Sequence, residues 1–168
     1  MRTVNLYSDQ LALDPDFYEL LVSSHARFVR DPLADFGSGP NWMYQAAPFA
    51  VVAHDAERDP KFVYANMTAQ RVFGYSWKEF IALPSRLSAR IENREERRYL
   101  LDAVSRNGSY VGYEGSRVKK SGEIFSMEDG VIWQLVDDHG HCYGQAAMFS
   151  RWTNVHTQND PPAKQPAA

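Results

Sequence analysis

The feature that most constrains the fold lies in the second half of the chain, where the sequence acquires a period of two. After Gly108 come three runs of strand length, SYVGYEGSRVKK, EIFSMEDGVIWQLV and HCYGQAAMFSRW, separated only by the turns KSGE and DDHG. Connections this short join antiparallel neighbours, because parallel strands need a crossover of a dozen or more residues. The sequence therefore predicts an antiparallel meander of three strands.

The last of these strands predicts that both faces of the sheet are covered. A strand with one face in water would alternate between apolar and polar side chains. Here both parities are apolar, with Cys142, Ala146 and Met148 on one and Tyr143, Ala147 and Phe149 on the other. We expect short helices to cover one face. An N-terminal helix, capped by Asp14, opened by Pro15 and ended by Pro32, is the predicted cover for the other.

The first half of the chain supplies two more strands and the helices. Strands are predicted within APFAVVAHDA and KFVYA, and the second one turns at Asn66 into a short helix that Gly74 ends. Ser76 to Glu79 has the S-x-x-E form of a capping box, which predicts a second short helix. A longer helix should start at a cap on Asn93 and stop at Gly108. The fold class is thus α+β, with a five-stranded antiparallel sheet.

Composition limits the partners and the cellular location. With 168 residues and a net charge of −3, the chain is one domain with no general attraction to nucleic acid or to an anionic membrane. The single Cys142 excludes an internal disulfide and fits a reducing compartment. The N-terminal residues lack the apolar core of a signal peptide, and no run approaches the length of a bilayer span. We therefore expect a cytoplasmic protein.

This order of elements resembles the PAS fold, in which a five-stranded sheet and short helices surround a pocket. The blocks YAN, VFGYSWKEF and GQAAMFSRW carry the resemblance, together with APFAVVAHDAERDPKFVYAN and LPSRLSARIENREER. They are similar to the MEKHLA domain, a PAS-like family found alone in bacteria and at the C-terminus of plant class III homeodomain–leucine zipper proteins. The hexapeptide that names the family does not occur here. The predicted parts are an N-terminal segment (1–13), a helix and linker (14–41), a PAS-like domain (42–152) and a disordered tail (153–168).

The resemblance implies a pocket between the sheet and the short helices. Phe73, Trp77, Phe80 and Leu83 would face the sheet from the helical side. A ligand pocket also needs a few convergent polar groups among apolar walls, and the candidates are Asn66, Tyr113, Glu128 and Gln145. Arg86 precedes the long helix and could reach an anion at the pocket mouth, although a structural ion pair is the alternative.

Neither flavin nor haem is expected as a cofactor. In flavin photosensors of this fold a reactive Cys follows the second helix, and the corresponding position here is Ser85, which cannot form the flavin–sulfur adduct. Met148 stands where those sensors commonly carry a Gln that bonds to the flavin ring. Haem needs an axial ligand inside the pocket, yet no His or Cys occurs between Lys61 and Asp138. His54, at the end of the first strand, is poorly placed for that role.

The remaining reactive residues do not form a catalytic or metal site. The cluster HGHC, from His139 to Cys142, lacks the second ligand pair of a structural zinc site and is interpreted as a polar turn before a buried thiol. Glu128 and Asp129 point to opposite faces of a strand. A buried Glu128 could serve as an acid, but an edge carboxylate paired with Arg117 or Lys119 is the preferred interpretation. We therefore expect no enzyme.

Two functions remain open. The first is a sensory module whose pocket binds a small molecule and which signals through a partner or an oligomer. The second is a pure protein-interaction module whose pocket is filled by its own side chains. In either case the N-terminal helix or a sheet face is the expected contact for a protein partner or a homodimer. A small enzyme is the third and weakest alternative.

Overall fold

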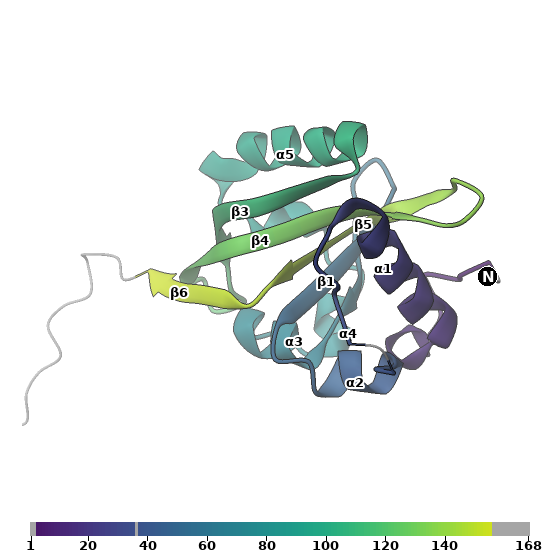
Figure 1. Ribbon diagram of the computed structural model, residues 1–168. Helices are drawn as coiled ribbons and strands as arrows, with labels where there is room; N and C mark the ends of the chain where they lie inside the picture. The colour runs from purple at the N-terminus through teal and green to yellow at the C-terminus, as the bar shows by residue number, and fades with distance from the viewer. Residues whose placement is uncertain (1–2, 36, 156–168) are drawn as a thin grey trace, which may run out of the picture.

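The computed structural model describes residues 3–35 and 37–155, and an antiparallel sheet lies at its centre (Figure 1). The strand order is β2-β1-β5-β4-β3, and a sixth strand, β6, pairs with the first half of β4. The predicted meander is confirmed, and the sheet has one strand more than predicted. The strands are β1 (Ala50–Asp55), β2 (Phe62–Ala65), β3 (Ser109–Val118), β4 (Ile124–Val136), β5 (Cys142–Phe149) and β6 (Arg151–Val155).

Helices cover both faces of the sheet. The N-terminal segment with η1 (Leu11–Leu13), α1 (Pro15–Phe28) and α2 (Pro40–Gln45) forms the outer layer. The inner layer contains α3 (Met67–Phe73), α4 (Trp77–Phe80), the 3-10 turns η2 (Ser85–Ser88) and η3 (Ile91–Asn93), and α5 (Arg94–Asn107), which lies along β3 in Figure 1. No helix of the part that the structure describes is long and apolar enough to cross a membrane.

The short inner helices begin and end where the sequence predicts. The Asn66 side chain accepts a hydrogen bond from the Ala69 N–H, and Ser76 and Glu79 form the reciprocal capping box of α4. Gly108 ends α5 with a φ of +87°, and a Cβ there would lie 2.3 Å from the Phe28 ring at the end of α1. Gly108 therefore serves both the left-handed turn and the close approach of α1. The predicted cap at Asn93 is wrong, because its side chain makes no capping bond and η3 leads directly into α5.

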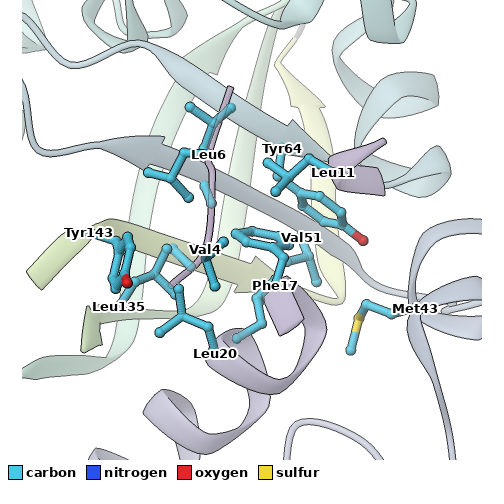
Figure 2. Packing of buried hydrophobic residues seen from close by; sticks show 14 of the residues in the cluster. Val4, Leu6, Leu11, Phe17, Leu20, Met43, Val51, Tyr64, Leu135 and Tyr143 are labelled. Carbon is cyan, nitrogen blue, oxygen red and sulfur yellow. The ribbon is translucent and has the colours of Figure 1, made fainter. Parts of the chain in front are cut away.

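The outer layer packs on the sheet within the chain, as the apolar parity of the last strand predicts. Leu20 and Leu21 of α1 are buried completely, and Figure 2 shows Leu20 and Phe17 in one cluster with Leu135 and Tyr143 of the sheet. The Ser24 hydroxyl donates to the carbonyl of Val136 and accepts from its N–H, both at 2.9 Å. The Ser24 side chain thus satisfies the backbone N–H and carbonyl of Val136 at the end of β4.

The faces of β5 differ from simple alternation because the strand is irregular at Gly144. Gly144 has a φ of +148°, and the pairing register of β4 with β5 shifts at this point. Tyr143 therefore belongs to the outer cluster together with Ala146, whereas alternation alone placed these two residues on opposite faces. A Cβ at position 144 would lie 1.9 Å from the carbonyl oxygen of His54, so only glycine fits against β1 here.

Two predicted boundaries also move. Strand β6 extends to Val155, so residues 153–155 of the predicted tail are part of the sheet, and residues 156–168 lie outside the described residues. Helix α2 begins at Pro40, inside the predicted linker. The predicted N-terminal segment, residues 1–13, contributes Val4, Leu6 and Leu11 to the outer cluster. Figure 2 shows these three side chains over the sheet.

Candidate functional site

Two hollows with four lining residues in common lie on the inner side of the sheet. The inner cavity, between the sheet and the inner layer, has a volume of about 50 Å³. The outer cleft, of about 670 Å³, lies between the β1–β2 turn, α5 and the start of β5. His54, Arg97, Leu101 and Gln145 line both hollows, and we call these four residues the neck. The neck is thus the part of the wall that the cleft and the cavity have in common.

The inner cavity combines apolar walls with a few polar groups, as small-molecule sites do. Its apolar walls include Val52, Phe62, Phe73, Leu100, Ile132 and Phe149. Its polar lining consists of His54, Ser85, Ser88, Arg97, Arg117 and Gln145. Because these polar residues come from β1, η2, α5, β3 and β5, the whole fold is needed to bring them together.

Two of the cavity residues are buried arginines. Arg97 and Arg117 are each 8% exposed, and neither lies within 4.0 Å of a carboxylate among residues 3–35 and 37–155. Arg97 donates through Nη2 to the Ser85 hydroxyl. Burial, with the positive charge of Arg117 as the next cause, lowers the pKa of Arg97 to about 10. Arg97 therefore stays protonated at neutral pH, with the positive charge of Arg117 acting on it within this small space.

Tyr113 positions the second arginine. The Arg117 Nη1 donates to the Tyr113 hydroxyl at 3.1 Å and to the carbonyl of Ser116 at 2.9 Å. The guanidinium also lies over the Tyr113 ring, 5.3 Å from its centroid, which is a cation–π contact. Gly115 leaves room for this arrangement, because a Cβ there would lie 2.2 Å from the Tyr113 hydroxyl. Tyr113 therefore supports the cavity through Arg117.

The neck offers a free acceptor beside the charged donors. The Gln145 Nε2 donates to the carbonyl of Leu101 at 2.9 Å and to the Ser105 hydroxyl at 3.1 Å. Its Oε1 is buried and has no hydrogen-bond partner among the described residues. Burial lowers the pKa of His54 to about 4, so that ring is neutral at pH 7. Since the carbonyl of Asp55, 2.8 Å from Nδ1, can only accept, the His54 proton lies on Nδ1.

Of the predicted pocket residues, Phe73 and Gln145 line the inner cavity and Tyr113 lies behind it. Leu83 packs against the inner cluster without lining the cavity. The prediction that Trp77 faces the pocket is wrong, because its ring packs in the outer cluster, 5.6 Å from the Tyr44 ring and 5.8 Å from the Tyr64 ring. Phe80, by contrast, is fully buried in the inner cluster, as predicted.

Asn66 is a structural residue, which corrects its candidacy as a ligand contact. Its Oδ1 accepts from the N–H groups of Ala69 and Val51, both at 3.0 Å. Its Nδ2 donates to the carbonyls of Phe49 at 2.9 Å and Met43 at 3.2 Å. The side chain is completely buried with these four bonds, so none of its hydrogen-bonding groups faces the cavity.

Met148 and Glu128 are also away from the cavity. Met148 packs in the outer cluster, paired with Val51 and Val131, so the comparison with the ring-binding Gln of flavin sensors is wrong for this side chain. Glu128 lies on β4, which is not an edge strand because β3 and β6 pair with it on either side. It accepts from the Thr153 hydroxyl at 3.2 Å and lies 4.0 Å from Arg151. The predicted edge carboxylate paired with Arg117 or Lys119 is therefore wrong, because both partners of Glu128 come from β6 and Arg117 lines the cavity.

Arg86 lines the outer cleft and forms an exposed ion pair with Asp59 at 3.1 Å. The structure confirms the alternative prediction for Arg86, a salt bridge, on the wall of the cleft. The residues that sequence reasoning missed are His54 and Leu101 of the neck and the two buried arginines. A signal was present for Arg97, which precedes Leu100 by three residues and Val104 by seven, and therefore shares their buried helix face. Because Arg97 lies in an Arg- and Glu-rich segment, its burial was not expected from the sequence.

The geometry does not fit flavin or haem. A volume of about 50 Å³ is far below the roughly 300–1,000 Å³ of pockets for ligands of that size. The hydroxyl of Ser85, at the position of the reactive thiol, bonds to Arg97. His54 does reach the cavity, contrary to the prediction, and its Nδ1 bond to a carbonyl does not engage Nε2, so the small volume is the observation that argues against haem.

The HGHC segment spans the end of the turn between β4 and β5 and the first residue of β5, which confirms the predicted turn. His139 and His141 donate their backbone N–H groups to the Asp137 carboxylate, both at 2.9 Å. Across the residues with a described structure, no group of three or more His, Cys, Asp or Glu side chains is arranged to hold a metal ion. The Cys142 thiol, predicted to be buried, is exposed.

Several solved structures share this architecture. The PAS domain of a protein from Colwellia psychrerythraea has a TM-score of 0.56 at 18% identity, covering 67% of this chain and 90% of that one. The light-state dimer of the fungal blue-light photoreceptor Vivid has a TM-score of 0.54 at 17% identity, covering 77% and 90%. An RNA-binding light-oxygen-voltage receptor has a TM-score of 0.57 at 18% identity, covering 76% of this chain and only 37% of that receptor. These likenesses establish the fold.

No curated protein matches the sequence. The model of the MEKHLA domain, however, matches residues 16–154, which include all but the first residue of α1 and all but the last residue of the sheet. The match thus includes α1 in the family's domain, whereas the sequence analysis assigned it to a separate segment. The chain is a member of the MEKHLA domain family and has a PAS-like fold.

Proposed function

We propose that this protein is a sensory module that binds a small molecule in the inner cavity and transmits binding through the sheet. The observation that carries the proposal is the neck, which a polar, open cleft and a cavity with mostly apolar walls share as lining. Within that neck, and among the residues that the structure describes, Gln145 has a buried acceptor without a partner and Arg97 a buried charge without a carboxylate. Buried polar groups of this kind are costly unless a ligand or water satisfies them.

The route for a signal starts on the strands that carry the neck. His54 lies in β1, one residue before its end, and is paired with Gln145 of the neighbouring strand β5. On their opposite face, Val51 and Ala146 pack under the outer layer. A displacement of either neck residue would therefore reach α1 through one strand thickness. A change in the packing of α1 would then alter contacts with a partner or a second copy.

A pure interaction module is the second candidate, and the small volume of the cavity favours it. Exposed Tyr99, Tyr110 and Val111 on α5 and β3 offer such a module an apolar contact surface. We expect no enzymatic activity in either case, because the Ser85 hydroxyl faces a cationic guanidinium rather than a base that could activate it. The exposed Cys142 continues to favour a reducing, cytoplasmic location.

Native mass spectrometry of the purified protein tests the proposal. We expect a mass excess under native conditions that disappears on denaturation, because a small molecule occupies the cavity. Ala147→Val adds two methyl groups to the cavity wall and should reduce this excess. Ser126→Val, on the opposite face of β4, should not. Equal native and denatured masses, in a protein whose melting temperature no small-molecule mixture raises, would contradict the sensory function and favour the interaction module.

A further inference from the structure

The two buried arginines reverse the usual arrangement of charge in a protein. Four arginines with exposed side chains face carboxylates: Arg27, Arg86, Arg90 and Arg151 lie within 4.0 Å of Asp138, Asp59, Glu92 and Asp129. Arg97 and Arg117, each more than nine-tenths buried, have only hydroxyl and carbonyl partners among the described residues. Buried charges are normally paired. This pair therefore lacks the anion that its environment calls for.

The charges near the arginines do not supply that anion. Asp59, the acid whose negative charge acts on Arg97, is itself exposed and paired with Arg86. The outer cleft has five basic and five acidic side chains along its wall and is balanced. The inner cavity has both arginines, a neutral His54 and no acidic residue in its lining. Selection for negative charge is thus a property of the inner cavity and not of the cleft.

We propose that the inner cavity binds a small organic acid, with its carboxylate held by Arg97 and Arg117. The short aliphatic part of the acid packs against Phe73, Leu100 and Ile132. This proposal rests on the small-molecule function proposed above and names the ligand class. Guanidinium groups match carboxylates because their N–H donors form a planar fork that binds both oxygens. The apolar walls disfavour an inorganic anion, which has no apolar part to bury.

The size of the cavity limits the acid. About 50 Å³ is several times the roughly 10–15 Å³ that a single water requires, but it is too small for a long chain or a ring system. Arg97 lines the neck as well as the cavity, so the carboxylate sits near the neck and the chain points inward. We therefore expect butyrate to bind more tightly than acetate, which buries less, and than octanoate, which does not fit.

Calorimetric titration with sodium butyrate tests the proposal, with butyramide, butylamine and inorganic phosphate as matched probes. We expect butyrate to bind at least tenfold more tightly than each of the other three. Losing the hydrogen bonds of one guanidinium should weaken butyrate binding roughly 10- to 100-fold in Arg97→Met and in Arg117→Met. Arg97→Lys, which keeps the charge without the fork, should fall between. Arg98→Met, an exposed neighbour on the wall of the cleft, should change affinity less than about twofold.

Thermal melting without ligand separates a binding role from a structural one. Replacing an unpaired buried charge by a hydrophobic side chain of similar size should leave the melting temperature unchanged or raise it. Arg97→Met should therefore melt at or above the wild-type temperature while losing its response to butyrate. A large fall in melting temperature in both Arg97→Met and Arg97→Lys, with butyrate binding intact, would show that Arg97 only supports the fold and would overturn the proposal.

The other outcomes separate this proposal from the proposed function. Equal binding of butyramide and butyrate would refute the anion requirement while the small-molecule function stands. Tighter binding of phosphate, with the same dependence on Arg97, would refute the organic acid. If none of the probes binds, the ligand class is wrong, and the mass difference between native and denatured protein then decides whether the sensory function fails with it.

Discussion

Replacing Asn66 by alanine should destabilise this protein far more than the loss of an ordinary helix cap. The side chain makes four hydrogen bonds at 2.9–3.2 Å and is completely buried. It joins the end of β2 to the start of β1, to the end of α2 and to the first turn of α3. The change removes all four bonds and leaves two N–H groups and two carbonyls without that partner.

The size of the effect follows from these bonds. Loss of an N-cap costs about 1 kcal/mol, and each of the three remaining bonds contributes about 1 kcal/mol net. The expected loss for Asn66→Ala is therefore about 4 kcal/mol, a large part of the roughly 5–15 kcal/mol by which a domain is stable. With a urea m-value of about 2 kcal/mol/M, the unfolding midpoint would fall by about 2 M.

Ser76→Ala is the matched control, because Ser76 caps α4 from an exposed position and bonds only within its own capping box. It should cost about 0.5–1 kcal/mol. Urea unfolding of both variants, followed by circular dichroism, measures the two losses. If Asn66→Ala is no more destabilising than Ser76→Ala, then the bonds to β1 and α2 contribute nothing, and the account of Asn66 as the joint of the fold is wrong.

Three further predictions concern pH, the N-terminus and colour. Burial lowers the pKa of both His25 and His54 below 6.5, so the unfolded chain binds protons more readily than the folded protein. The free energy of unfolding should therefore fall as the pH drops from about 6.5 towards 4. His25→Phe should reduce this fall, and a wild-type stability that does not depend on pH in this range would contradict the prediction. Deleting residues 1–34 removes Leu20 and Leu21, each contributing about 1.5–3 kcal/mol, and should cause aggregation or loss of cooperative melting; an equally stable soluble monomer would refute the packing of α1. The purified protein should be colourless, and a flavin or Soret band that survives gel filtration would disprove this.

Much of the fold could be predicted because local signals agree along the chain. The turns KSGE and DDHG, the caps at Asn66 and Ser76 and the stop at Gly108 each act within a few residues, and the structure confirms them. The faces of β5 could not be predicted in full, since the irregularity at Gly144 depends on the close approach of β1. That is a tertiary contact, and it moves Tyr143 to the opposite face.

The candidate site was harder to predict than the fold because its polar members come from distant segments. Phe73 and Gln145 were identified, whereas Arg117 was expected to pair with a carboxylate at the sheet edge and Arg97 was not singled out. Charge alone does not tell a solvated arginine from one turned inward, and only its phase with Leu100 marks Arg97. Asn66 shows the opposite error: it was predicted to contact a ligand, but all its side-chain hydrogen bonds are made to backbone groups.

The most direct test of the central claim is a methyl-resolved NMR titration of the full chain with sodium butyrate. The account predicts that Leu100 and Ile132, on the walls of the inner cavity, shift first and saturate together with the side-chain amide of Gln145. Leu13, exposed on the outer layer, provides the internal control and should not move. Shifts confined to residues outside the cavity and neck, or none at butyrate concentrations that saturate the calorimetric signal, would contradict binding in the inner cavity.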